Sequence, residues 1–125
     1  MYATVVDSTP LIKVSTSKFE ANYALDGSLM NPLEAFYASL AACAAVYAKK
    51  ACKGLGISAA GIEINCKPFA GPGGPLTLAK FKTDVRFPAS FTAEQKAAVL
   101  ESIVHCAVKE VVADGPNIEF IVSEV

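Results

Sequence analysis

The stretch that most restricts how this chain can fold runs from Asn31 to Gly54 and has the composition of one long helix. Alanine, the strongest helix former, fills much of it. Asn31 can cap the first turn, Pro32 stands where its missing N–H costs nothing, and Glu34 complements the positive end of the helix dipole. Lysines crowd the last turns, and Gly54 can adopt the left-handed conformation that closes a helix. We therefore predict a single helix over residues 31–54.

A cysteine, Cys43, stands near the middle of this helix with two alanines on either side. These side chains are so short that another backbone element can lie directly against the thiol. We predict that this element is a second helix that contains Cys106. From spacing alone, both thiols are also compatible with a role as small buried hydrophobic groups, which is the commonest fate of a free cysteine.

The composition bears on the number of domains and on the partners. A chain of 125 residues predicts one domain, over residues 1–125. Hydrophobic residues make up 53% and charged residues 18% of it, and the mean hydropathy is +0.40, which is more apolar than a monomer of this size needs. We therefore expect a homo-oligomer. The net charge of -1 and the pI near 5.8 give no broad attraction to phosphates, so a nucleic-acid partner is excluded.

The N-terminal ten residues lack the basic start and apolar core of a signal peptide, and we find no apolar run long enough to cross a bilayer. We therefore expect a cytoplasmic protein without a membrane partner. In that compartment the four cysteines rest as thiols, and a disulfide is expected to be transient and functional.

Strands are predicted on both sides of the long helix. Before it, β-branched and aromatic residues between turn formers predict a meander of two or three antiparallel strands, over residues 2–6, 11–15 and 18–23. After it, apolar and polar side chains alternate in residues 57–69 and again in 76–87. These two runs are predicted to pair as a hairpin across the glycine- and proline-rich connection 70–75.

The last third of the chain predicts a second helix and a final strand. Pro88 ends the preceding strand, and Thr92 with Gln95 matches a capping box for a helix through Ala113. Residues 118–122 are predicted to be a strand. The resulting order, βββ-α-ββ-α-β, indicates an α+β fold with a mainly antiparallel sheet and two cysteine-bearing helices.

The remaining cysteines and the single histidine are interpreted as structural. Cys52 lies about 13 Å along the helix axis from Cys43, too far for a disulfide, and Cys66 lies on a predicted strand. His105 is next to Cys106, but neighbours on a helix point about 100° apart, so we interpret it as a satisfied or partly exposed side chain. Because Cys-x-x-Cys spacing is missing, we expect no zinc and no other cofactor.

Two segments resemble a known family. Residues 31–43, NPLEAFYASLAAC, are similar to the Asn/Ser-Pro-Glu-x-Leu-x-x-Ala-x-x-Ala-Ala-Cys helix of the OsmC/Ohr family, the osmotically inducible and organic-hydroperoxide-resistance proteins. His-Cys-Ala-Val at 105–108 resembles the family's second-cysteine motif, which is Cys-Pro-Val in many members. Chain length, element order and the distance between the cysteines also fit, so the resemblance extends over essentially the whole chain and favours the broader OsmC-like branch.

The resemblance implies an intertwined homodimer with its active sites at the subunit interface. It implies that Cys43 is the peroxidatic thiolate that attacks an organic hydroperoxide, and that Cys106 resolves the sulfenic acid by forming a disulfide. An external dithiol would then restore both thiols. On this basis Cys43 and Cys106 are the candidate catalytic residues, and hydroperoxide and dithiol are the expected partners.

Two charged positions differ from those of the family's peroxidases. The residue after Pro32 is Leu33 where the peroxidases have glutamate, and no arginine precedes Arg86. An alternative function therefore stays open at this stage. It is a non-catalytic dimeric stress protein that binds a small apolar ligand between its helices, with both cysteines merely packed.

Overall fold

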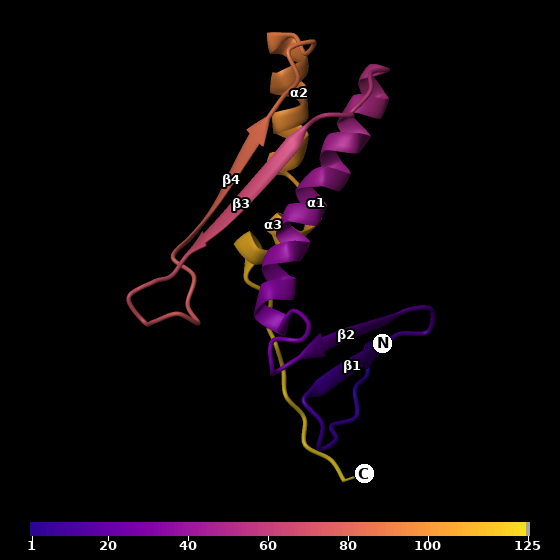
Figure 1. The fold of residues 1–125 in the computed structure, drawn as a ribbon, viewed down its shortest axis with the longest axis vertical. Coiled ribbons are helices and arrows are strands. Elements are labelled where there is room, and N and C mark those ends of the chain that lie inside the picture. Colours follow the sequence, from indigo (N-terminus) through magenta and orange to yellow (C-terminus); the bar gives the residue numbers. More distant parts are fainter. Residues whose placement is uncertain (125) are drawn as a thin grey trace. The chain divides into compact units, whose positions relative to one another are not determined.

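The computed structural model describes residues 1–124, which form two compact units. The first unit contains Met1–Ser39 and Pro68–Phe81, and the second contains Leu40–Lys67 and the chain from Lys82 onward. Helix α1 begins in the first unit and ends in the second, as its continuous ribbon shows in Figure 1.

Helix α1, Pro32–Leu55, begins where the sequence predicted. The Asn31 side-chain oxygen accepts a hydrogen bond from the Glu34 N–H at 2.9 Å, and the Glu34 carboxylate accepts one from the Asn31 N–H at 3.1 Å. The predicted closure at Gly54 is wrong. Gly56, with φ of +70°, is the left-handed residue, and Ile57 N–H returns to the Cys52 carbonyl at 3.0 Å.

The first unit is built on two antiparallel strands, β1 (Leu11–Ser15) and β2 (Glu20–Ala24). Of the two or three strands predicted before α1, two are present, and residues 2–6 form one bridge, in which Ala3 and Ser15 exchange hydrogen bonds of 2.9 and 3.0 Å. Beyond that bridge the chain turns away, since the Asp7 carboxylate accepts hydrogen bonds from the N–H and the hydroxyl of Thr9.

The predicted hairpin after α1 is present as β3 (Glu63–Phe69) and β4 (Lys80–Arg86), which run in opposite directions (Figure 1). Both strands are shorter than the alternating pattern predicted. Residues before β3 form a turn in which Gly61 has φ of +90°. Residues before β4 form a tight loop, held by the Thr77 hydroxyl, which donates to the Gly74 carbonyl at 2.6 Å.

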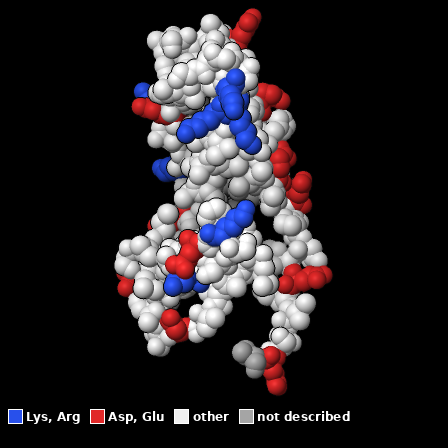
Figure 2. All heavy atoms as spheres, turned by 90° about the vertical axis from the view of Figure 1, so that its right-hand side faces the viewer, with Lys and Arg blue, Asp and Glu red and all other residues white. Residues whose placement is uncertain are grey.

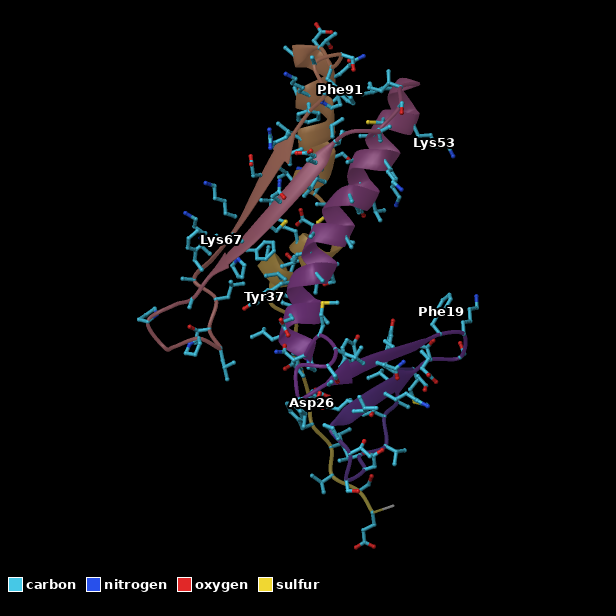
Figure 3. All side chains as sticks on the ribbon, viewed as in Figure 1. Phe19, Asp26, Tyr37, Lys53, Lys67 and Phe91 are labelled. Atoms are coloured by element: carbon cyan, nitrogen blue, oxygen red, sulfur yellow. The ribbon has the colours of Figure 1, made fainter. Side chains whose placement is uncertain are left out.

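The core of the second unit lies between α1 and α2 (Ala93–Val104) and is covered by side chains of the hairpin. Phe91 is buried just before α2 begins (Figure 3), and its ring lies 5.3 Å from that of Phe87. The predicted capping box is confirmed, since Thr92 and Gln95 cap each other reciprocally. The buried members of this core are Ala44, Ala48, Cys52, Phe91, Val99 and Ile103.

The second predicted helix is broken. It was expected to run unbroken through Ala113, but α2 ends at Val104 and a separate helix, α3 (Ala107–Asp114), follows. Cys106, expected near the middle of a helix, has extended backbone angles, φ of −64° and ψ of 147°, and is the N-cap of α3. No proline or glycine causes the break. Cys106 is buried while both its neighbours are exposed, so packing of this residue accompanies the break.

The predicted final strand at residues 118–122 is also wrong within the part of the chain that the structure describes. Its apolar side chains, Ile118, Phe120, Ile121 and Val122, are between 72% and 98% exposed. A strand needs a neighbouring strand to satisfy its backbone groups, and the described residues provide none here. The α+β class is confirmed, and residues 1–124 contain two two-stranded sheets and three helices.

Candidate functional site

The two candidate catalytic cysteines lie in the second unit, on different elements. Cys43 is on α1 and is partly exposed, whereas Cys106 is 3% exposed at the start of α3. Both are free thiols. Cys106 follows the buried residues Ile103 and Val99 by three and seven positions, the spacing of one helix face, and it is buried although the helix is broken before it.

The two thiols interact. Burial raises the pKa of the Cys106 thiol, and the neighbouring Cys43 thiol raises it further. The backbone N–H groups of Lys109 and Val108, at the start of α3, act in the opposite direction. Burial thus favours the protonated form of the Cys106 thiol. Cys106 is the N-cap of α3 rather than a residue inside a helix, and its pairing with Cys43 stays a prediction.

A hydrogen bond between helices lies next to this pair. The Ser102 hydroxyl on α2 donates to the Tyr47 carbonyl oxygen on α1 at 3.1 Å. Tyr47 is one helical turn after Cys43, so the two lie on the same face of α1. This bond fixes α2 against α1 close to the thiols, and nothing in the sequence pattern had singled out Ser102.

His105 is exposed, as expected, but has a role that the sequence did not reveal. Its Nδ1 lies 3.0 Å from the Glu110 carboxylate of α3, and its Nε2 lies 3.2 Å from the Glu101 carboxylate of α2. The hydrogen bond with Glu110 raises the pKa of His105, and the charge of Glu101 adds to the effect. Glu101 is four residues before His105, so its contact with His105 could have been predicted from helix spacing. The contact of Glu110 could not, because the break was not predicted.

Comparison with protein families identifies the chain. The family model described as "OsmC-like protein" matches residues 25–121. The chain belongs to the OsmC-like family. This match includes both cysteines and confirms the resemblance found in the two motifs.

Solved structures share the fold of this OsmC-like protein. An OsmC-like protein from Mycoplasma pneumoniae matches with a TM-score of 0.73 and 13% identity, over 92% of this chain and 87% of that one. A Psychrobacter arcticus protein, described as an osmotic stress induced and detoxification response protein, matches with a TM-score of 0.71 and 13% identity, over 87% of this chain and 85% of that one. Comparison with curated protein sequences gives no match.

The other two cysteines of the OsmC-like protein, Cys52 and Cys66, pack against residues other than Cys43 and Cys106. Cys52 is fully buried in the core of the second unit. Cys66, on β3, has its sulfur 3.6 Å from the Thr83 hydroxyl of β4. Within residues 1–124, no group of three or more His, Cys, Asp and Glu side chains is arranged to hold a metal ion.

The cations Arg86, Lys13 and Lys50 have partners other than a thiol. Arg86 pairs with Glu63 at 3.4 Å, and Lys13 pairs with Glu20 at 3.8 Å. The Lys50 ammonium lies over the Tyr47 ring, 4.8 Å from its centre. Glu34 is engaged in capping α1. Figure 2 shows charged side chains scattered among large uncharged areas on the face turned to the viewer.

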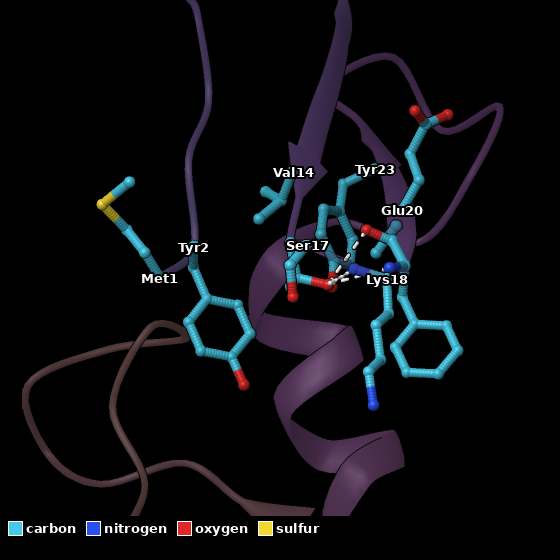
Figure 4. Close-up of a pocket in the computed structure, with 10 residues that line it drawn as sticks. Met1, Tyr2, Val14, Ser17, Lys18, Glu20 and Tyr23 are labelled. Atoms are coloured by element: carbon cyan, nitrogen blue, oxygen red, sulfur yellow. Dashed lines mark hydrogen bonds between the residues drawn. The ribbon is translucent and has the colours of Figure 1, made fainter.

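Each unit also contains an open cavity. In the first, about 400 Å³ lies beside the β1–β2 turn, where Tyr2 and Lys18 lie at its edge (Figure 4). In the second, about 340 Å³ lies between α1 and β3, with walls of alanine and isoleucine and one charged residue, Lys49. Of the helices in residues 1–124, none combines the length and the apolar character needed to cross a membrane.

Proposed function

We propose that this OsmC-like protein is a thiol redox protein that reduces organic hydroperoxides through Cys43 and Cys106. The main support is that a chain of this family has two free thiols, Cys43 and Cys106, on separate elements of one unit, and that Cys43 is among the groups that raise the pKa of Cys106. A second line of support is the printed description of the Psychrobacter arcticus structure, which refers to osmotic stress and detoxification.

The proposed chemistry has three balanced steps. The Cys43 thiolate attacks one oxygen of the O–O bond, which breaks, and the alcohol leaves after taking up a proton. Cys43 is then a sulfenic acid. The Cys106 sulfur attacks the Cys43 sulfur, a disulfide forms, and the hydroxyl leaves as water with the Cys106 proton. An external dithiol finally supplies two electrons and two protons and restores both thiols.

Accessibility supports the assignment of roles. Cys43 is the more exposed of the two thiols, so a hydroperoxide reaches it first. Cys106 is buried and its pKa is raised, which makes it a poor first nucleophile because only the thiolate attacks. It suits the second step, in which it needs to reach only the adjacent Cys43.

We expect this reduction to be slow and to take place in the cytoplasm, where thiols are kept reduced. Leu33 replaces the acid that the family's peroxidases have after the proline, and Arg86 is paired with Glu63. A lysine would supply charge near the peroxide without the forked hydrogen bonds of arginine.

We further propose that the protein is a homodimer. The apolar side chains of residues 118–122 are strongly exposed, and so are Tyr2, Val5 and Val6 near the N-terminus. A second copy of the chain would cover such surface. Sedimentation equilibrium is expected to give twice the chain mass for the wild type and a weaker dimer for Ile121→Asp. Ser123→Asp is the matched control, because it adds the same charge at a polar residue just after this apolar segment.

The enzymatic proposal is tested by hydroperoxide consumption. Cumene hydroperoxide and dithiothreitol are supplied to the reduced protein, and alcohol release is followed. We expect turnover for the wild type and none for Cys43→Ser. In a parallel reaction without dithiothreitol, Cys106→Ser should release one equivalent of alcohol and stop at the sulfenic acid, whereas the wild type should stop at the disulfide. Cys66→Ser serves as control and should retain activity. No consumption by the wild type would refute the enzymatic proposal.

The alternative, a non-catalytic protein that binds a small apolar ligand, is favoured by one observation. The cavity of about 340 Å³ has apolar walls, although it lies between α1 and β3 rather than between two helices. Binding of an apolar fluorescent probe that is lost in Ala48→Phe, together with no hydroperoxide turnover, would favour this function over the first.

A further inference from the structure

The junction between α2 and α3 consists of His105 and Cys106. His105 N–H donates to the Ser102 carbonyl and Cys106 N–H to the Ile103 carbonyl, at 3.2 and 3.1 Å, so α2 closes in a tightened turn. The extended backbone of Cys106 then lets α3 start in a new direction. The second reactive thiol therefore sits at a joint between two helices.

The two helices that meet there are held unequally. Helix α2 buries Val99 and Ile103, and Ser102 bonds it to α1. Helix α3 has no fully buried residue. The orientation of α3, and with it the direction of the Cys106 sulfur, thus depends on a small number of contacts.

His105 provides such contacts on both sides of the joint. Its two ring nitrogens lie 3.2 Å from Glu101 on α2 and 3.0 Å from Glu110 on α3. Lys109 also lies 3.8 Å from Glu110 and adds a second positive charge beside this carboxylate. We call the His105–Glu101–Glu110 arrangement the histidine bridge.

We propose that His105 is a positioning residue whose imidazole joins α2 to α3 and thereby keeps the Cys106 thiol where Cys43 can reach it. This inference rests on the proposed function of Cys43 and Cys106. It adds His105 to the site as a residue that acts through Cys106 and does not itself contact the hydroperoxide.

The bridge depends on the proton of the imidazole. The charged groups around it are Glu101 from α2 and Glu110 and Lys109 from α3. The next residue in the chain is Cys106, whose thiol is influenced by that of Cys43. In imidazolium both ring nitrogens donate, one to each carboxylate. In neutral imidazole one nitrogen has only a lone pair, which faces a carboxylate oxygen, so one side of the bridge is lost.

The experiment measures how well the two thiols are held together. The full-length reduced protein is equilibrated with mixtures of reduced and oxidised glutathione, trapped by alkylation and analysed by mass spectrometry for the Cys43–Cys106 disulfide. The two protein thiols are oxidised, and one glutathione disulfide is reduced to two thiols. The equilibrium constant reports the effective concentration of one thiol at the other.

Three proteins are compared at pH 6 and pH 8.5. We expect the wild-type equilibrium constant for disulfide formation to fall about two- to fivefold from pH 6 to pH 8.5, which is the range typical of exposed ion pairs. His105→Gln should have the lower constant at both values, since glutamine has no charge. His105→Arg, which stays charged and can donate to both carboxylates, should keep the higher constant at both.

The outcomes separate this inference from the proposed function. Equal constants and equal pH profiles in wild type and His105→Gln would overturn the positioning role alone, and so would failure of His105→Arg to restore the constant at pH 8.5. The expected profile without hydroperoxide consumption would overturn only the enzymatic function. A wild-type protein that forms no Cys43–Cys106 disulfide would overturn both.

Discussion

The hydroxyl of Ser102 donates a hydrogen bond of 3.1 Å to the carbonyl oxygen of Tyr47, 55 positions earlier in the chain. This bond joins α2 to α1 near both thiols. Replacement of Ser102 by alanine should lower the free energy of unfolding by about 1 kcal/mol, the net value of a typical hydrogen bond. Urea denaturation checks this, with Ser90→Ala as the control because Ser90 is exposed. Equal losses in the two variants would mean that the bond contributes nothing.

Val99 is the largest fully buried aliphatic side chain of the second unit, and Val104 on the same helix is 49% exposed. Val99→Ala removes two methyl groups from the core and should cost about 2 kcal/mol of unfolding free energy. Val104→Ala is the matched control and should change it by less than about 0.5 kcal/mol. Similar losses at both positions would contradict the placement of the core between α1 and α2.

The four thiols should react with iodoacetamide in an order set by burial. Cys43 and Cys66 are partly exposed, whereas Cys52 and Cys106 are buried. We expect the first two to be alkylated in the native reduced protein before the others, because a buried thiol reacts only when the structure opens locally. Mass spectrometry of digests taken over time gives the order. Unfolded protein in guanidinium is the control, in which all four should react alike.

Stability should depend on pH through the histidine bridge. The pKa of His105 is raised above its ordinary 6.5, so its contribution is complete below pH 6.5 and is lost as the pH rises through the raised value. The pKa of Glu110 is lowered from 4.5, chiefly by its hydrogen bond with His105, so its contribution is present above pH 4.5 and is lost as the pH falls. The bridge should therefore stabilise most between these limits.

Thermal unfolding of the wild type and of His105→Gln, at intervals from pH 3 to pH 8.5, measures this contribution. The difference between their midpoints should be largest near pH 5.5 and should shrink in high salt, because the groups are exposed. Lys96→Gln, on the same helix but outside the bridge, should follow the wild-type profile. A midpoint difference that does not vary with pH would contradict the bridge.

Local signals in the sequence were sufficient to predict α1 and the capping box of α2. Asn31, Glu34, Thr92 and Gln95 act on residues within one turn of themselves, so their effect needs no knowledge of the rest of the fold. The closure of α1 was missed by two residues, because Gly54 and Gly56 are equally able to adopt the left-handed conformation.

The break at Cys106 and the missing strand at residues 118–122 could not be predicted for a common reason. Both depend on what lies beside the segment. Residues 104–107 contain no helix breaker, and the burial of Cys106 accompanies the break. Residues 118–122 have the composition of a strand, but no strand of the described residues pairs with them. The pairing of Cys106 with Cys43 stays a prediction, whereas the contact of Glu110 with His105 depends on the break and was missed.

The separation of α2 from α3 makes their helical phases independent. A residue inserted into α1 would rotate every later side chain of that helix by about 100° and turn Cys52 out of the core. A residue inserted between Ile103 and His105 would leave the core contacts of α2 and the helical phase of α3 unchanged, but it would alter the four-residue spacing that brings Glu101 to His105. Such a change of length should therefore preserve the core and weaken the histidine bridge, whereas an insertion in α1 should disrupt the core.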